Sequence, residues 1–322
     1  MRFKDFSFPS RRSPLTARNG MAATSQPLAA QAGLNVLRAG GNAIDAAVAT
    51  VATLCVVEPC STGVGGDAFA LIWSADEQRL YGINASGPAP MGLTADLVRS
   101  RGHVTFPTRG GLPVTVPGAV RGWQLALERF GTMGLDTLLT QPIEYARDGY
   151  PVSMMIAQAW RNSTELLSRL PDSQRVWLPA GRAPQMTELF RNPEFAATLQ
   201  KLAENGYDAL YVGDIAAQIA AAVRADGGVM TEEDLAGYRA EWVEPIAIEY
   251  RDGYSFHEIP PNGQGLAALL ALNIARGFDL RTMTYGSADY YHVLIESMKL
   301  GFADAHSYIA DPRQLLCRWM PC

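Results

Sequence analysis

Apolar residues dominate the segment from Ala43 to Val57, so that a helix built from it would be apolar on every side. A helix of that kind is buried in the protein interior. Asn42 precedes the segment and Asp45 falls in its first turn, where a side-chain acceptor and a negative charge stabilise a helix N-terminus. Pro59 ends the segment. The pattern therefore predicts a buried helix over residues 43–57.

Short apolar runs separated by turn residues predict strands that come in pairs. Residues 68–74 and 79–85 form one expected pair, joined by a polar turn. Residues 243–250 and 254–259 form the other, around an Asp-Gly turn. A further short strand is expected over residues 20–25.

Helical patterns fill much of the remaining chain. Pro27 stands in the first turn of a helix that ends at Gly40-Gly41, because proline is tolerated there and glycine commonly follows a helix. Further helices are expected over residues 118–130, 135–147, 151–225 (several), 266–276 and 288–309. Because strands come in pairs and helices in blocks, the order predicts an α+β protein.

Composition and charge narrow the functional classes. The chain has 322 residues, 48% hydrophobic and 18% charged, which is ordinary for a globular protein. A net charge of −5 argues against nucleic-acid and acidic membrane partners. The N-terminus lacks the apolar core of a secretory signal, so we expect a cytoplasmic location. The cysteines form no Cys-x-x-Cys pair and are expected to be free thiols; they are Cys55, Cys60, Cys317 and Cys322.

The residues alone reveal no complete catalytic set. The glycine-rich loop Gly63-Val-Gly-Gly-Asp67 does not match a phosphate-binding motif. It is either a tight turn packed against other backbone or a loop bordering an active site. The four histidines are scattered along the chain, so no metal site is expected. By this reasoning alone the chain is a globular α+β protein, and a binding or structural role stays open.

Several stretches together resemble the γ-glutamyltranspeptidase family, in the order and spacing of that family. Gly40-Gly-Asn-Ala-Ile-Asp-Ala-Ala is the most specific of them. The others are Gly20-Met-Ala-Ala-Thr-Ser, Val57-Glu-Pro with Gly63-Val-Gly-Gly-Asp, Val116-Pro-Gly-Ala-Val-Arg-Gly-Trp, Tyr145-Ala-Arg-Asp-Gly-Tyr-Pro-Val, Pro260-Pro-Asn-Gly-Gln-Gly and Phe302-Ala-Asp-Ala-His-Ser-Tyr-Ile-Ala-Asp-Pro. The family-like region covers residues 20–312, between a leader, residues 1–19, and a tail, residues 313–322.

The resemblance implies a four-layer αββα sandwich of the N-terminal-nucleophile hydrolase type, here incomplete because the small-subunit part is missing. It also implies a proenzyme that cleaves itself into a large and a small subunit and needs no cofactor. The new N-terminal residue is a threonine whose hydroxyl attacks an amide, with its own α-amine as the base. The substrate would be a small-molecule amide, and the partner the small subunit of the same precursor.

The chain departs from the family pattern at its end. Relatives continue past the stretch that matches Ala310-Asp-Pro312 and reach a Thr-Thr or Thr-Ser cleavage site, whereas the tail here does not resemble them. We therefore assign no catalytic residue to this chain and expect no turnover from it alone. The alternative function is a truncated, catalytically inactive fragment with a binding role.

A second departure concerns the substrate. In glutathione-processing members an arginine clamps the α-carboxylate of the γ-glutamyl group, and Asn84 occupies that place here. Asn84 is either a polar turn residue or a substrate contact, and Ser86 either forms a local turn or lines the pocket. The form of these motifs is similar to an acylase-like and oxamate amidohydrolase-like branch. This favours an oxamate-like or glutaryl amide over a γ-glutamyl amide such as glutathione.

The remaining candidate site residues lie in two loops that the resemblance expects to border the pocket. They are Gly65, Gly66, Asp67, Gly263 and Gln264.

Overall fold

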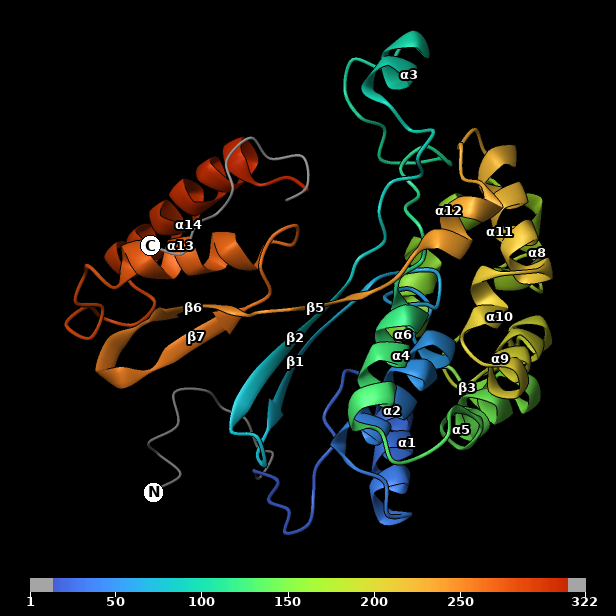
Figure 1. Ribbon diagram of the computed structural model, residues 1–322, viewed down its shortest axis with the longest axis horizontal. Coiled ribbons are helices and arrows are strands. Elements are labelled where there is room, and N and C mark those ends of the chain that lie inside the picture. The colour runs from blue at the N-terminus through green and yellow to red at the C-terminus, as the bar shows by residue number, and fades with distance from the viewer. Residues whose placement is uncertain (1–13, 312–322) are drawn as a thin grey trace. The chain divides into compact units, whose positions relative to one another are not determined.

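The computed structural model describes residues 14–311 (Figure 1). These residues form two compact units, each made of two stretches of chain. Unit 1 contains residues 14–61 and 131–200, and unit 2 contains residues 62–130 and 201–311. The predicted tail lies outside the described residues, as do Cys317, Cys322 and most of the predicted leader.

Unit 1 is almost entirely helical. Helices α1 and α2 pack against each other, and α5 packs on α2. Its helices are α1 (Pro27–Arg38), α2 (Ala43–Val57), α5 (Leu135–Asp148), α6 (Met154–Asn162), α7 (Thr164–Leu167), α8 (Pro171–Trp177) and α9 (Pro193–Asn205), the last of which ends beyond residue 200. Two short strands, β3 (Tyr150–Pro151) and β4 (Leu189–Phe190), pair antiparallel.

Local sequence explains how α1 and α2 begin and why they pack closely. Asn42 caps α2, and a capping box joins it to Asp45. A side chain at Gly33 of α1 would place its Cβ 2.2 Å from Thr50 Oγ1 of α2, so only glycine allows this approach. The predicted helix over residues 43–57 is confirmed with the same bounds.

Unit 2 contains the larger sheet and two groups of helices. Its strands are β1 (Ala68–Ser74), β2 (Arg79–Ala85), β5 (Glu241–Val243), β6 (Ile246–Glu249) and β7 (Ser255–Glu258). Its helices are α3 (Ala95–Ser100), α4 (Ala119–Phe130), α10 (Asp208–Tyr211), α11 (Asp214–Ala225), α12 (Glu232–Gly237), α13 (Gly265–Ala275) and α14 (Ala288–Tyr308), with a 3₁₀ turn at Arg251–Gly253.

The three-stranded sheet of unit 2 has the antiparallel order β1-β2-β5. Phe69, Asn84 and Glu241 lie opposite one another across the three strands and therefore share one face of the sheet. The other face holds buried Ile83 and Ala85, and α4 packs against this part of β2. β6 and β7 form a separate hairpin, and α13 packs on α14.

Two predicted strands are wrong. Residues 20–25 form no strand, because they are hydrogen-bonded to no strand of the sheets within residues 14–311. The predicted strand over residues 243–250 is divided at Pro245, whose missing N–H and fixed φ interrupt a ladder. Its first part, β5, pairs with β2, and its second part, β6, pairs with β7.

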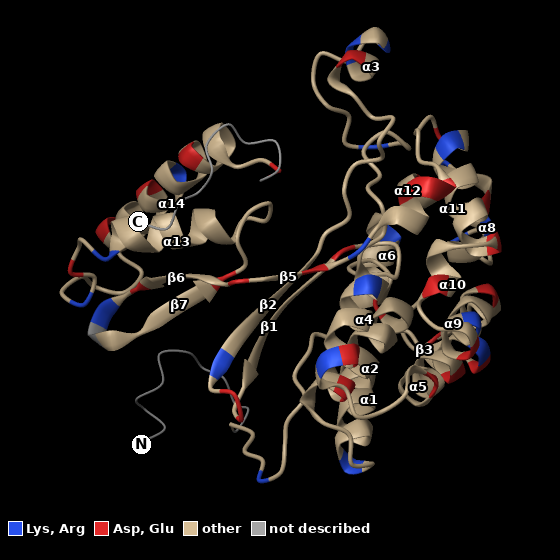
Figure 2. Cartoon of the chain, viewed as in Figure 1, with Lys and Arg blue, Asp and Glu red and all other residues tan. Residues whose placement is uncertain are grey.

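Charged residues are unevenly distributed over unit 2. Figure 2 shows α13 and β1 without charge, whereas α12 and α14 carry several acidic residues. Within residues 14–311, no helix combines the length and apolarity required to cross a bilayer. Cys55 is buried and Cys60 is exposed, and neither is part of a disulfide, as expected.

Candidate functional site

The candidate site lies at the end of β2 in unit 2. Strand alternation turns Asn84 to the face opposite the buried side chains of Ile83 and Ala85. Asn84 and Ser86 are both half-buried. The backbone N–H of Ser86 donates to Asn84 Oδ1 over 3.0 Å, which is the local bond of an Asx turn. The expected turn role of Asn84 is therefore present in the structure.

Two glycines hold the end of β2 directly against the segment from Val116 to Gly118. A Cβ at Gly87 would lie 1.4 Å from the carbonyl oxygen of Val116, and one at Gly118 would lie 1.8 Å from that of Ala85. The N–H of Val116 also donates to the Pro88 carbonyl over 3.0 Å. The two backbones are in contact without room for a side chain, which fixes the position of the turn that carries Ser86.

The loop of residues 63–67 is hydrogen-bonded to the N-terminus of α4. The Gly66 carbonyl accepts from the N–H groups of Gly118 and Ala119 at 2.8 and 3.0 Å. These donors are among those that a helix start leaves without an intrahelical partner. The interpretation of this loop as a turn packed on other backbone is thus confirmed. Gly65, Gly66 and Asp67 are exposed, and their bordering of a pocket stays a prediction.

A third side chain, that of Asn262, joins Asn84 and Ser86. Asn84 Nδ2 donates to Asn262 Oδ1 over 2.9 Å, and Asn262 Nδ2 donates to Ser86 Oγ over 2.8 Å. Ser86 Oγ donates to Asn84 Oδ1 over 2.7 Å and closes the ring. We call these three side chains the amide ring. Asn262 belongs to the Pro-Pro-Asn-Gly-Gln-Gly loop, whose sequence does not single this residue out from Gly263 and Gln264.

Tyr238 supports the amide ring from the interior. Its hydroxyl donates to the Ser86 carbonyl over 3.4 Å, and the residue is 7% exposed. Burial raises the pKa of Tyr238 to about 12, and the charge of Glu241 acts in the same direction. The phenol therefore stays protonated near neutral pH and continues to donate.

The structure places the other two predicted loop residues next to Asn262. Gln264 is exposed and occupies the N-cap position of α13, without a capping bond from its side chain. Gly263 has open space around the position of a Cβ. Their role at a pocket stays a prediction, whereas Asn262 is the residue of this loop that contacts Asn84.

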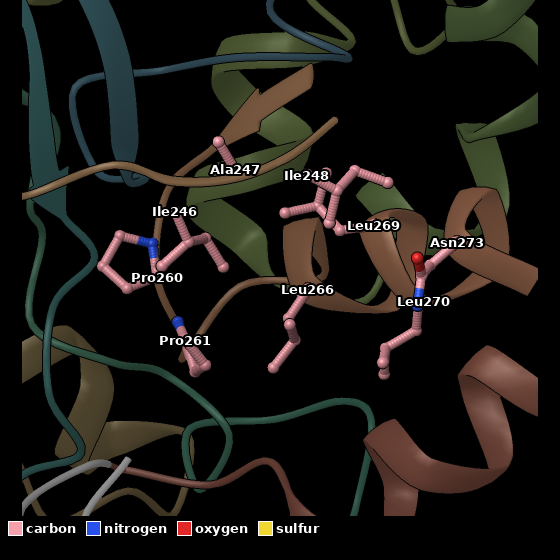
Figure 3. Close-up of a pocket in the computed structure, with 9 residues that line it drawn as sticks. All are labelled: Ile246, Ala247, Ile248, Pro260, Pro261, Leu266, Leu269, Leu270 and Asn273. Carbon is pink, nitrogen blue, oxygen red and sulfur yellow. The ribbon is translucent and has the colours of Figure 1, made fainter. Parts of the chain in front are cut away.

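A cavity of about 300 Å³ lies between β6, the two prolines before Asn262, and α13 (Figure 3). Its lining is apolar except for Asn273 and carries no titratable side chain. The lining residues are Ile246, Ala247, Ile248, Pro260, Pro261, Leu266, Leu269, Leu270 and Asn273. The cavity offers no acid, base or nucleophile. Within residues 14–311, no three His, Cys, Asp or Glu side chains are grouped to hold a metal ion.

Comparison with known families gives a match to γ-glutamyltranspeptidase over residues 29–317. The chain is 38% identical to the glutathione hydrolase-like YwrD proenzyme of Bacillus subtilis, over 91% of this chain and 55% of that protein. It is 36% identical to the oxamate amidohydrolase proenzyme of Klebsiella pneumoniae, over 92% and 56% respectively. The chain thus spans about half the length of these curated relatives.

Comparison with solved structures gives a cephalosporin acylase from Bacillus halodurans with a TM-score of 0.89 and 45% identity. The similarity covers 98% of this chain and 60% of that one. It confirms the expected fold class, a mixed α and β chain of the N-terminal-nucleophile hydrolase type.

Proposed function

Because the chain belongs to the γ-glutamyltranspeptidase family, we propose that it forms the substrate-side part of an enzyme that hydrolyses or transfers the acyl group of a small acyl amide. The nucleophile would be the N-terminal threonine that the family resemblance implies, with its α-amine as the base. That threonine would belong to a second segment of the same precursor. The hydroxyl would attack the amide carbonyl, the C–N bond would break, and the amine would leave with the proton taken by the α-amine. The acyl group would then pass from the acyl-enzyme to water or to an acceptor amine.

The observation that carries the choice of substrate is the neutral amide ring. Asn84 stands where the resemblance expects an arginine in glutathione-processing members. Its side chain is bonded to an amide and a hydroxyl and brings no charge. An arginine presents a fork of charged donors that fits a carboxylate, whereas an asparagine presents neutral donors. The proposed substrate is therefore one that neutral donors can hold, an oxamate-like or glutaryl amide that lacks the α-amino group of a γ-glutamyl amide.

The face of the sheet that carries Asn84 supports a second polypeptide as partner. Phe69, Leu71 and Trp73 of the edge strand β1 are 44%, 41% and 57% exposed, and Phe69 shares the face of Asn84. An apolar row on an edge strand is a surface that proteins normally cover. A second segment of the precursor that covered this row would lie next to the amide ring, where the acyl amide has to meet its nucleophile.

The exposed row also fits the alternative function, a non-catalytic fragment that binds a partner. The two differ in turnover. The test is to express the gene with the coding sequence downstream of the Cys322 codon and to assay oxamate, glutaramate and a γ-glutamyl anilide. The proposal expects cleavage of oxamate or glutaramate. No cleavage of any of the three would refute it and leave the binding fragment.

The Asn84→Arg variant of the same protein tests the choice of substrate. A charge-assisted bond to the α-carboxylate contributes about 1.5–3 kcal/mol, so kcat/KM for the γ-glutamyl anilide should rise by roughly tenfold or more. Asn205→Arg, at the exposed end of α9, is the matched control and should change nothing. An Asn84→Arg variant that is folded and shows no gain would contradict the assignment of Asn84.

A further inference from the structure

The direction of every hydrogen bond in the amide ring follows from one backbone group. The N–H of Ser86 can only donate, and it donates to the oxygen of the Asn84 side chain. The amide nitrogen of Asn84 must then point to Asn262, which meets it with its oxygen. The nitrogen of Asn262 in turn points to Ser86 Oγ. Neither amide can be reversed without placing two donors or two acceptors against each other.

This fixed direction determines what the ring offers to a ligand. Asn84 Oδ1 accepts from both the N–H and the hydroxyl of Ser86, so both of its lone pairs are used. Each amide nitrogen carries two hydrogens, and one hydrogen of each is used within the ring. One N–H of Asn84 and one N–H of Asn262 are left over. Asn262 is exposed, so its remaining N–H faces water, whereas the remaining N–H of half-buried Asn84 is the neutral donor that the ring offers to an acceptor such as a carboxylate or carbonyl oxygen.

We infer that Asn262 is a specificity-determining positioning residue, which holds the Asn84 amide with its donor available for an acceptor oxygen at the far end of the acyl group. The inference rests on the proposed function for its substrate. It adds that the site selects substrates whose acyl group ends in a hydrogen-bond acceptor. A glutaryl group, which ends in a carboxylate, has this feature, whereas a pentanoyl group of the same length does not.

The spatial arrangement explains why Asn262 can act through Asn84. The backbone after Asn84 is held by the Asx turn at Ser86 and by the close contact of Gly87 with Val116. Ser86 holds the oxygen of the Asn84 amide, and Asn262 holds the nitrogen, so Asn262 is the second point at which the amide plane is fixed. Without Asn262, water would compete for that N–H and the amide would be held through its oxygen alone, so the remaining donor would be directed less strictly.

The experiment uses the protein expressed with its downstream coding sequence and compares wild type, Asn84→Ala, Asn262→Ala and the double variant. Two readouts are taken: glutarate binding by calorimetry, and the separate kcat and KM for glutaramate and pentanamide. We expect Asn262→Ala to weaken glutarate binding and raise the KM for glutaramate by about tenfold, the loss of roughly one hydrogen bond to a charged group. The kcat for glutaramate and both constants for pentanamide should stay unchanged.

The double variant tests action through Asn84. If Asn262 only orients Asn84, then Asn262→Ala adds little once Asn84 is alanine, because coupled residues are not additive. Asn262→Asp keeps the acceptor for Asn84 but adds a negative charge, so it should bind glutarate more weakly than Asn262→Ala. Asn205→Ala is the control for an exposed asparagine.

The outcomes separate this inference from the proposed function. If the wild type binds glutarate but cleaves no amide, and Asn262→Ala weakens this binding about tenfold, the positioning role is upheld and the proposed activity is rejected. Turnover of acyl amides with equal losses for glutaramate and pentanamide, or fully additive losses in the double variant, would reject the positioning role and uphold the activity. No binding of glutarate by the wild type would also overturn the inference.

Discussion

Replacing Asp45 should destabilise unit 1 more than any exposed acidic residue does. Asp45 is 0% exposed. Its carboxylate accepts from the N–H of Asn42 at 2.8 Å and from those of Thr132 and Met133 at 2.9 and 3.2 Å. The Thr132 hydroxyl donates to it as well. One side chain thus joins the start of α2 to the loop before α5, and its removal breaks all of these bonds.

The magnitude follows from the donors left behind. Asp45→Ala removes the acceptor of three backbone N–H groups, and a net loss of about 1 kcal/mol for each predicts about 3 kcal/mol of lost stability. Asp45→Asn keeps an acceptor oxygen but turns an amide nitrogen towards donors, so about 1–2 kcal/mol is expected. The assay is guanidinium-induced unfolding of the purified chain. Asp136→Ala, an exposed acid in the first turn of α5, is the control and should cost below about 1 kcal/mol.

The pH dependence gives a second check on the same side chain. Burial acts to raise the pKa of Asp45, but the hydrogen bonds from Thr132, Asn42 and Met133 outweigh it and hold the pKa below its ordinary value of 3.8. A depressed pKa in the folded state means that this stabilisation is present above the unfolded value and is lost as pH falls through the folded one. The gap in unfolding free energy between wild type and Asp45→Asn should therefore narrow below about pH 4.

Two results would refute this reasoning about Asp45. One is an Asp45→Ala variant that loses less than about 1 kcal/mol, which would mean that water replaces the carboxylate without cost. The other is a gap between wild type and Asp45→Asn that stays constant down to pH 3, which would mean that the folded state does not favour the ionised carboxyl.

Two further predictions concern unit 2. Gly87→Ala should lower the melting temperature, because its Cβ would lie 1.4 Å from the Val116 carbonyl oxygen. In the protein expressed with its downstream sequence, the same variant should reduce kcat/KM for acyl amides at least tenfold. Gly237→Ala is the control, since the position of its Cβ has open space around it. Trp73→Glu should reduce both the binding of an apolar dye and the concentration-dependent association of the chain alone, measured by fluorescence and light scattering, because Trp73 is 57% exposed in the apolar row of β1. Unchanged association would show that the chain does not associate through the apolar row of β1.

Elements with strong local signals were predictable from the sequence. The helix over residues 43–57 and the strands over residues 68–74 and 79–85 have the predicted bounds, because a cap, a proline and a polar turn lie within a few residues of their ends. The capping box of Thr231 and Asp234, which starts α12, is a local signal of the same kind. Such signals act over one or two turns of chain, and neighbouring residues alone determine them.

Which distant segments pair as strands could be learned only from the tertiary structure. No local pattern shows that residues 20–25 have no strand to pair with, or that β5 leaves the hairpin of β6 and β7 to pair with β2. Strand pairing is a contact between segments far apart in the chain. Pro245 marks only the point at which the chain leaves its pairing with β2 and begins its pairing with β7.

In the candidate site, too, some residues could be predicted from the sequence and others only from the tertiary structure. Asn84 and Ser86 could be chosen from the sequence, because they follow a strand and depart from a family pattern at a known place. Asn262 could not, since it lies 178 residues from Asn84 in a loop whose sequence favours a turn. The loop that carries Asn262 lies beside the end of β2, and this placement brings the ring together. Sequence determines which polar groups a loop carries, and only the packing of the sheet and its loops determines which of them meet.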